Sequence, residues 1–308
     1  MTHRLPLSTD GLEELDRLSR VRLVAIDIDG TLLDQPSAHV AEVISALNRS
    51  LGHYRRGVIL TIATGRAFGG ARPVVERLRL SRRTPVILYN GAVICTADGS
   101  SLVRLHSLHS DQIAQIVELA TKAELSPLVY EPDLALALRG NDAYPAGSIV
   151  EKVTGFSAEV GSAIEFNGLP VEWRTSTAAV PESAAAIVIP IPLGMPTDLL
   201  AALEQFDGAT VTKSSSAYLE IRPKGANKGA ALSIVASRFS LTPDQVLAIG
   251  DNDNDAEMLR WAGCSVAVAN STPSALAASD YVTAGAAGQG VVETLRLVFD
   301  ARRQRLRA

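Results

Sequence analysis

Cysteine and aromatic residues are both scarce in this chain of 308 residues. Cys95 and Cys264 are the only cysteines and form no C-x-x-C pair, which argues against a disulfide scaffold and a structural zinc site. Aromatic residues make up 5% of the chain, too few for the stacking surfaces that bind single-stranded nucleic acid. The remaining composition is that of a globular protein, because 47% of the residues are hydrophobic.

An excess of basic residues is also missing. Lys and Arg number 29 against 33 Asp and Glu, which gives a net charge of −4. A surface that neutralises nucleic-acid phosphates needs the opposite balance, so we predict no nucleic-acid partner. We interpret the basic segment 302–307 as a solvated helix end that complements the helix dipole.

No apolar run is long enough to cross a bilayer. The longest, residues 184–195, is interrupted by Pro190 and Pro192. Charged residues stand among the first twenty positions, where a signal peptide would have its apolar segment. We therefore expect a soluble, cytoplasmic protein with no membrane partner.

Short apolar runs alternate with helix-length segments near both ends of the chain, a pattern typical of βαβ units. The runs expected to be strands are 21–28, 57–63, 85–89, 245–249 and 265–268. The segments expected to be helices are 38–51, 71–80, 228–239, 255–261, 273–278 and 291–303. The pattern predicts an α/β fold whose Rossmann-like core has a parallel sheet.

The middle of the chain has a different rhythm, with hairpin signals and fewer helices. We expect strands at 92–96, 102–106, 128–130, 134–138, 186–191, 209–212 and 218–221, helices at 111–124 and 197–206, and a polar loop after residue 138. This predicts an inserted α+β domain at 92–215, a core made from 21–91 and 216–308, and an N-terminal extension at 1–20.

Polar residues gather where the predicted core strands end. The first strand leads into Asp27 and Asp29, the second into Thr64-Gly65-Arg66, the third into Asn90-Gly91 and a later one into 251–255. In a parallel sheet these ends share one edge, which is where such folds bind ligands. Clustered carboxylates require a cation, and hard oxygen ligands beside a phosphate favour Mg²⁺.

Other phosphate and metal motifs are absent or incomplete. Asp251, Asp253 and Asp255 match the start of an EF-hand loop, but Ala256 and Ala262 replace its glycine and its final glutamate. The sequence has no Walker-type loop, no dinucleotide fingerprint after the first strand and no G-x-S-x-G elbow, and no histidine lies in the strand-end motifs. A carboxylate is the remaining nucleophile, and it can form an aspartyl-phosphate.

Together these motifs resemble those of haloacid dehalogenase-type phosphatases, most closely the Cof-like branch (subfamily IIB). The matching segments are Asp27-Ile28-Asp29-Gly30-Thr31-Leu32-Leu33, Thr64-Gly65-Arg66, Lys228-Gly229 and Gly250-Asp251-x-x-Asn254-Asp255, with flanking patterns at Asn90-Gly91-Ala92 and Glu220-Ile221-x-Pro223. The resemblance covers about residues 21–298. The inserted domain matches only in position and size.

The resemblance implies a role for each motif residue. Asp27 is expected to be the nucleophile and a metal ligand, and Asp29 the general acid and base whose backbone carbonyl also binds the metal. Thr64 is expected to donate to a phosphoryl oxygen, and Lys228 to neutralise its charge. Asp251 would complete the Mg²⁺ site.

The remaining residues are expected around the phosphate. Gly65, Arg66, Asn90 and Asn254 are predicted to lie against substrate or phosphate, while Asp255 would orient waters or Lys228. Two points stay open at this stage: Lys224 is an alternative to Lys228, and the basic residues Arg139, Arg174 and Lys213 are candidate contacts of the inserted domain.

The family resemblance implies a Mg²⁺-dependent phosphomonoester hydrolase that acts on small phosphorylated metabolites, such as sugar phosphates, through an aspartyl-phosphate. The inserted domain would then be a cap that closes over the site. Two alternatives remain: a phosphomutase or phosphotransferase of the same fold, and a non-catalytic phosphate-binding regulatory module.

Overall fold

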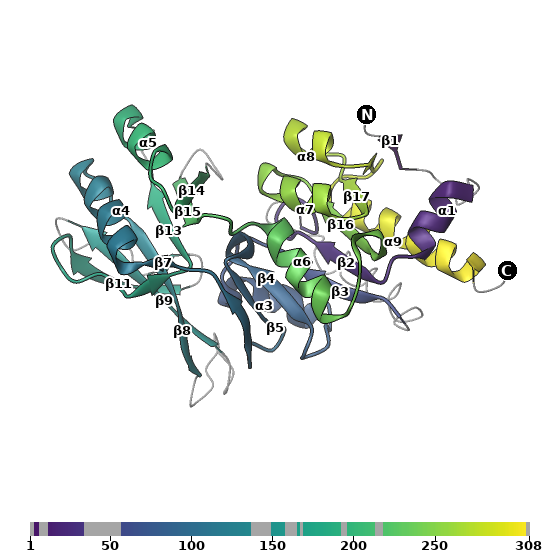
Figure 1. Cartoon of the computed structure of the whole chain (residues 1–308), viewed down its shortest axis with the longest axis horizontal. Helices are drawn as coiled ribbons and strands as arrows, with labels where there is room; N and C mark the ends of the chain where they lie inside the picture. The colour runs from purple at the N-terminus through teal and green to yellow at the C-terminus, as the bar shows by residue number, and fades with distance from the viewer. Residues whose placement is uncertain are drawn as a thin grey trace. The chain divides into compact units, whose positions relative to one another are not determined.

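The computed structural model describes residues 3–5, 12–33, 57–136, 149–157, 165–166, 169–191, 196–212 and 218–305. The chain forms two compact units (Figure 1). The first comprises residues 1–64, 73–87 and 227–308, and the second comprises 65–72 and 88–226. The predicted helix at 38–51 and the candidate contacts Arg139 and Lys213 lie outside the described residues.

A six-stranded sheet forms the centre of the first unit, in the order β1-β18-β17-β16-β2-β3. Its strands are β1 (His3–Arg4), β2 (Leu23–Ile26), β3 (Ile59–Ile62), β16 (Val246–Gly250), β17 (Cys264–Ala267) and β18 (Tyr281–Val282). All five pairings between neighbouring strands are parallel. The central strands β2, β16 and β17 are buried along their whole length, and β2 and β16 are almost entirely aliphatic, as expected for a parallel sheet covered on both faces.

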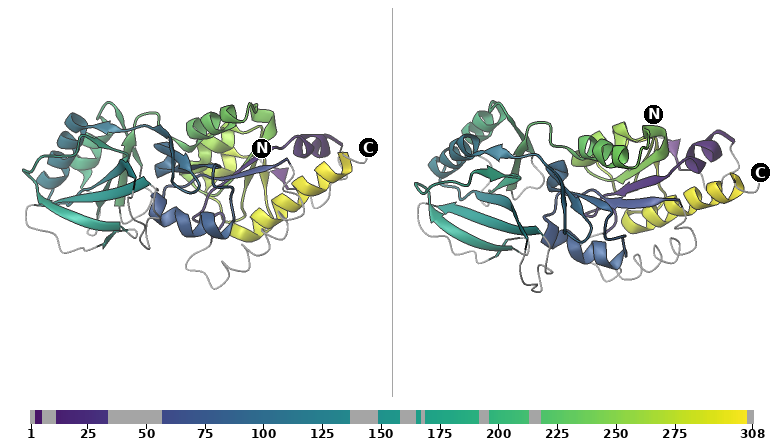
Figure 2. Two further views of the ribbon diagram at one scale, coloured as in Figure 1. Left: turned by 90° about the horizontal axis from the view of Figure 1, so that it is seen from below. Right: turned by 60° about the horizontal axis from the view of Figure 1, so that its bottom comes forward.

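Helices cover both faces of this sheet. Figure 2 shows α9 on one side and α6, α7 and α8 on the other. The helices of the unit are α1 (Leu12–Ser19), α6 (Lys228–Arg238), α7 (Ala256–Trp261), α8 (Pro273–Ala278) and α9 (Ala287–Arg305). Helix α1 packs against α9, so both β1 and α1, from the predicted N-terminal extension, contribute to the first unit. Two elements, α3 (Phe68–Arg77) and β4 (Pro85–Leu88), run across the boundary between the units.

The second unit is built on a seven-stranded mixed sheet in the order β10-β11-β9-β8-β13-β15-β14. These strands are β8 (Leu128–Leu136), β9 (Ile149–Ser157), β10 (Glu165–Phe166), β11 (Leu169–Thr175), β13 (Ala186–Pro190), β14 (Ala209–Thr212) and β15 (Tyr218–Pro223). The other elements of the unit are β5 (Val93–Thr96), β6 (Leu102–Leu105), β7 (Leu108–His109), β12 (Ser183–Ala184), α4 (Ser110–Lys122) and α5 (Thr197–Glu204).

The two faces of this sheet differ in chemistry. One face packs under α4 and α5 through a cluster of buried apolar side chains that includes Ile113, Ile116, Val129, Ile187, Leu199, Leu203, Leu219 and Ile221. Because side chains alternate along a strand, their neighbours point to the other face. There the sheet carries Tyr130, Glu220 and Arg222, which are buried although they are polar.

The α/β class and the parallel sheet are confirmed, whereas part of the second unit differs from prediction. The strands expected at 128–130 and 134–138 are one strand, β8, and the expected polar loop includes β9 and β11. Proline cannot donate a backbone N–H to a neighbouring strand, yet Pro132 does not end β8. The pairing of β8 with β13 covers only residues 128–130, and the register of β8 with β9 runs on through Pro132, which lies opposite Glu151.

Across the described part of the chain, no helix is both long and apolar enough to span a bilayer.

Candidate active site

Asp27 lies directly after β2, at the carboxyl edge of the parallel sheet. Its backbone N–H donates to the carbonyl of Ile249 in β16, at 3.1 Å, which continues the ladder one residue past the strand. The residue is 4% exposed. The parallel pairing of β2 with both β3 and β16 therefore brings the residues after three strands to one edge, as the sequence predicted.

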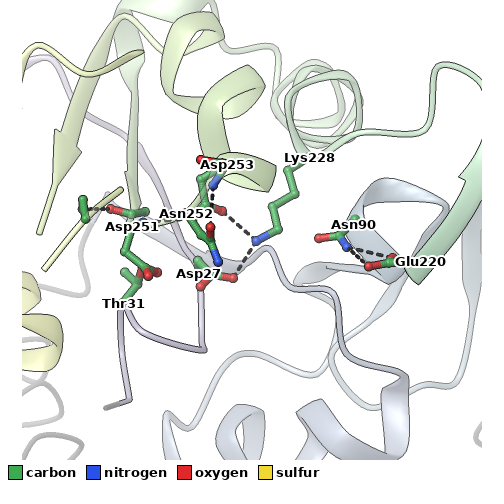
Figure 3. Close-up of polar contacts among 11 residues, drawn as sticks. Asp27, Thr31, Asn90, Glu220, Lys228, Asp251, Asn252 and Asp253 are labelled. Carbon is green, nitrogen blue, oxygen red and sulfur yellow. Dashed lines mark hydrogen bonds and ion pairs between the residues drawn. The ribbon is translucent and has the colours of Figure 1, made fainter. Parts of the chain in front are cut away.

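Lys228 is the first residue of α6, and its side chain is fully buried. Its Nζ donates to Asp27 Oδ1 and to Asp255 Oδ1, both at 2.6 Å (Figure 3). The side chain of Asn227 caps the helix by accepting from the N–H of Ala230, which fixes where α6 begins. Lys224, the alternative lysine, is exposed and pairs with Asp207 at 2.7 Å.

Asp255 connects the lysine to the loop that follows β16. While its Oδ1 accepts from Lys228, its Oδ2 accepts from the backbone N–H groups of Asp251 and Asn252, at 2.9 and 3.0 Å. Because both oxygens are engaged and the residue is fully buried, Asp255 fixes the backbone on which Asp251 is carried.

Asp251 is held from the opposite side by the first motif. Thr31 Oγ1 donates to Asp251 Oδ1 at 2.5 Å. Gly30 between them has φ of +87°, and a Cβ at this position would lie 2.3 Å from Asp251 Oδ2. Glycine is therefore required here on two grounds, the left-handed backbone and the close approach of the carboxylate.

Three buried carboxylates meet at this edge. Ligand oxygens of Asp27, Asp251 and Asp255 all lie within 4.8 Å of one another. Burial raises the pKa of Asp27 well above its usual range; Lys228 opposes the shift, and Asp255 and Asp251 add to it. Burial likewise raises the pKa of Asp251 to about 6, although the hydrogen bond from Thr31 favours ionisation. Such a cluster becomes fully ionised more easily when a cation is bound.

The other predicted residues of the first unit follow the ends of β2 and β3 or belong to the loop after β16. Asp29 is exposed, two residues after Asp27, in a turn closed by the hydrogen bond from Gly30 N to the carbonyl of Leu33. Thr64 is buried, and its backbone N–H donates to the carbonyl of Ile87 at 2.9 Å. Asn254 is half-buried in the single 3₁₀ turn Asp253–Asp255.

The second unit holds the remaining predicted residues. Gly65 and Arg66 are half-buried, and Arg66 Nη1 donates to the carbonyl of Gly70 at 3.0 Å. Asn90 is buried, and its Nδ2 donates to both carboxylate oxygens of Glu220, at 2.8 and 2.9 Å (Figure 3). Arg174, proposed as a contact of the inserted domain, pairs with Glu172 at the surface.

Three residues that contact the predicted set or its sequence neighbours received no role from the sequence. Thr31 and Glu220 stand inside motifs, but a motif does not tell which side chain each one meets. Glu151 lies in the segment expected to be a loop, and it is 4% exposed in β9. Because β9 also contains Lys152, Thr154 and Ser157, its sequence gives no apolar pattern against which Glu151 would stand out.

Comparison with known proteins gives the family of this chain. The profile of the haloacid dehalogenase-like hydrolases matches residues 24–295. A phosphoglycolate phosphatase of Methanothermobacter thermautotrophicus is 28% identical over 276 residues, which are 90% of this chain and 98% of that protein. The 5-amino-6-(5-phospho-D-ribitylamino)uracil phosphatase YcsE of Bacillus subtilis is 26% identical over 276 residues, with coverage of 90% and 95%.

A solved structure shares the fold. The crystal structure of a haloacid dehalogenase-like hydrolase from Bacteroides thetaiotaomicron aligns with a TM-score of 0.69 and 23% identity. The alignment covers 90% of this chain and 98% of that one, so it includes both units.

Proposed function

The chain belongs to the haloacid dehalogenase-like hydrolases and is a phosphatase, and on that premise we propose that it hydrolyses phosphomonoesters of small metabolites through an aspartyl-phosphate on Asp27. The observation that carries the proposal is the buried contact of Lys228 with Asp27 and Asp255, beside Asp251. A carboxylate held by a fixed ammonium group, in a site with further acids, suits a nucleophile that works on an anion.

The acids of the first unit fit a magnesium ion. Their donor atoms are hard oxygens that lie close together, and burial, with a smaller contribution from the neighbouring acids, raises the pKa values of Asp27 and Asp251. A bound cation would favour the ionised form of both groups. We propose that Asp27, Asp251 and the backbone carbonyl of Asp29 hold it. When bound, Mg²⁺ supplies positive charge that offsets the charge of the phosphoryl oxygens.

In the first half of the reaction, a carboxylate oxygen of Asp27 attacks phosphorus and forms the P–O bond of the aspartyl-phosphate. The bond between phosphorus and the alcohol oxygen breaks, and Asp29 gives its proton to that oxygen. The exposed position of Asp29 suits this role, because the side chain can reach a leaving group and exchange protons with water. Lys228 keeps Asp27 oriented during the attack.

In the second half, the Asp29 carboxylate takes a proton from water, and the water oxygen attacks phosphorus. The bond to Asp27 breaks, which releases inorganic phosphate and returns both acids to their starting states. Thr64 would donate to a phosphoryl oxygen, with Gly65, Arg66 and Asn254 nearby, and Asp255 would keep Lys228 in place.

We further propose that the inserted segment 92–215 is a cap that selects the substrate, and that 21–91 and 216–308 form the catalytic core. Support for a small phosphorylated substrate comes from the relatives, whose names give phosphoglycolate and a phosphorylated ribitylamino compound as their substrates.

Phosphate release from a panel of sugar phosphates and other phosphorylated metabolites, measured with and without Mg²⁺, tests the proposal. The control is Asp27→Asn, which keeps the shape of the side chain but removes the nucleophile. We expect this variant to lose at least about a hundredfold in kcat, or about 2.7 kcal/mol in barrier height. Release that is independent of Mg²⁺, or unchanged in Asp27→Asn, contradicts the mechanism.

A further inference from the structure

The turn from Tyr89 to Gly91 has an unusual backbone. Three consecutive residues have positive φ: Tyr89 at 49°, Asn90 at 51° and Gly91 at 101°. Glycine adopts this region freely and asparagine tolerates it, but tyrosine does so only at a conformational cost. A backbone of this kind persists where the surroundings fix it, and such places are often functional.

One group that fixes the turn is Glu220. Both of its carboxylate oxygens accept from Asn90 Nδ2, at 2.8 and 2.9 Å, and both residues are buried. The amide nitrogen of Asn90 is therefore engaged by a negative charge within the second unit. This contact suits a residue that orients the turn better than one whose nitrogen donates to phosphate.

A second carboxylate holds the turn from another strand of the same sheet. Glu151 Oε1 accepts from Tyr89 Oη at 2.7 Å and from the backbone N–H of Phe68 at 2.6 Å, and Oε2 accepts from the N–H of Gly69 at 2.9 Å. The Tyr89 ring also meets the Tyr130 ring edge to face, with centroids 5.8 Å apart. Glu151 thus ties the turn to the first residues of α3.

The Tyr89–Gly91 turn also contacts the segment that follows Thr64. Tyr89 N donates to the carbonyl of Arg66 at 3.2 Å. A Cβ at Gly65 would lie 3.0 Å from Asn90 Nδ2, so the Asn90 amide packs directly on the Gly65 backbone. The segment is therefore in contact with the turn on one side and, at Phe68 and Gly69, with Glu151 on the other.

We propose that Glu151 and Glu220 are positioning residues: from β9 and β15 they hold the strained turn at Tyr89–Gly91 and, through it, the Gly65–Arg66 backbone that is to receive the phosphate. The inference rests on the proposed function. Displacement of groups that orient a substrate lowers the rate even when the substrate still binds, because the reacting atoms are no longer aligned.

The test compares Glu151→Gln and Glu220→Gln with Glu131→Gln. Glu131 lies in the same sheet and accepts from Thr154 Oγ1 at 2.7 Å, so its variant is a matched control outside the turn. Each protein is assayed with p-nitrophenyl phosphate and Mg²⁺, below the onset of its own thermal unfolding, for kcat, KM and inhibition by inorganic phosphate. We expect kcat to fall about tenfold or more and phosphate inhibition to weaken in the two test variants, with both unchanged in the control.

Two milder variants test the positioning role if the glutamine variants do not fold. Tyr89→Phe removes one donor to Glu151, and Asn90→Gly removes the link to Glu220 while its backbone accepts positive φ freely. We expect both to fold and to lose kcat in the same direction.

The outcomes separate the two proposals. Folded variants whose kcat and phosphate inhibition stay within about twofold of wild type overturn the positioning role and leave the proposed function intact. A wild-type protein that releases no phosphate from any substrate overturns both. If the variants are less stable but their folded forms have unchanged kinetics, Glu151 and Glu220 contribute only to stability. That outcome also overturns the inference.

Discussion

Replacing Lys228 with methionine tests the electrostatic account of the site most directly. Methionine keeps much of the length and apolar volume of the side chain but removes the ammonium group. In the native protein, burial alone would lower the pKa of Lys228, but Asp255 and Asp27 outweigh that effect and raise it, so the group stays charged. The variant leaves two carboxylates buried without the cation that joins them.

The expected loss in the free energy of unfolding of Lys228→Met is large and depends on pH. Removing one partner of a buried ion pair destabilises a protein by about 3–5 kcal/mol, and Asp255 retains its two backbone donors, so we expect this range at pH 8. Asp27 already has a raised pKa, and without Lys228 that pKa must rise further. A carboxyl whose pKa is higher in the folded than in the unfolded state favours folding at low pH and opposes it as the pH rises. The deficit should therefore shrink by at least about 1 kcal/mol between pH 8 and pH 5.5.

The measurement is urea unfolding, followed by circular dichroism at both pH values in the presence of a chelator. Lys224→Met is the matched control, because Lys224 pairs with Asp207 at the surface, and its free energy of unfolding should stay within about 0.5 kcal/mol of wild type. Lys224→Met should also keep phosphatase activity, which Lys228→Met should lose. A deficit of equal size at both pH values would refute the reasoning, since it would come from packing rather than charge.

Three further predictions concern the acids. Asp29→Asn should lose turnover of alkyl phosphates while a phosphoenzyme accumulates with an activated leaving group; mass spectrometry that finds neither effect removes Asp29 from the mechanism. Ca²⁺, which accepts about six to eight ligands and bidentate carboxylates, should compete with Mg²⁺ and inhibit, so turnover with Ca²⁺ alone speaks against Asp27 as a singly coordinated nucleophile. Because burial raises the pKa of Asp251 to about 6, stabilisation by Mg²⁺ should grow between pH 5 and 7.5, and a thermal shift that is flat over this range contradicts the assignment.

The sequence predicts the first unit better than the second, for a physical reason. A parallel sheet covered on both faces needs uninterrupted apolar strands, and segments such as Leu23–Ile26 and Val246–Gly250 supply them. In the second unit one sheet face buries polar groups, so β9 carries the buried Glu151 and lacks an apolar pattern. The same residue explains why α3 begins at Phe68 instead of the predicted Ala71: its cap comes from a distant strand.

Some contacts of the candidate site could likewise be predicted from the sequence, and others could not. Strand ends in a parallel sheet share an edge, so the meeting of Asp27 with Asp251 and Lys228 follows from the order of the elements. The pairing of Asn90 with Glu220 does not, because it depends on the register of β15 and on a turn with positive φ. Asn90-Gly91 is compatible with positive φ, but the register of β15 and the positive φ of Tyr89 cannot be predicted from the residues near Asn90.

The hydrogen bonds of the three clustered acids distinguish what each can do. Asp255 accepts from Lys228 and from two backbone N–H groups, which engage both of its oxygens, so it is poorly suited to bind a metal or attack phosphorus. Asp251 accepts from Thr31 through Oδ1. Its Oδ2 lies against Gly30, which has no side chain that could block this oxygen. Asp27 accepts from Lys228 through Oδ1 at the sheet edge. The partners of each carboxylate therefore support the proposed division of roles, with Asp255 as support, Asp251 as metal ligand and Asp27 as nucleophile, and this support is independent of the family motif.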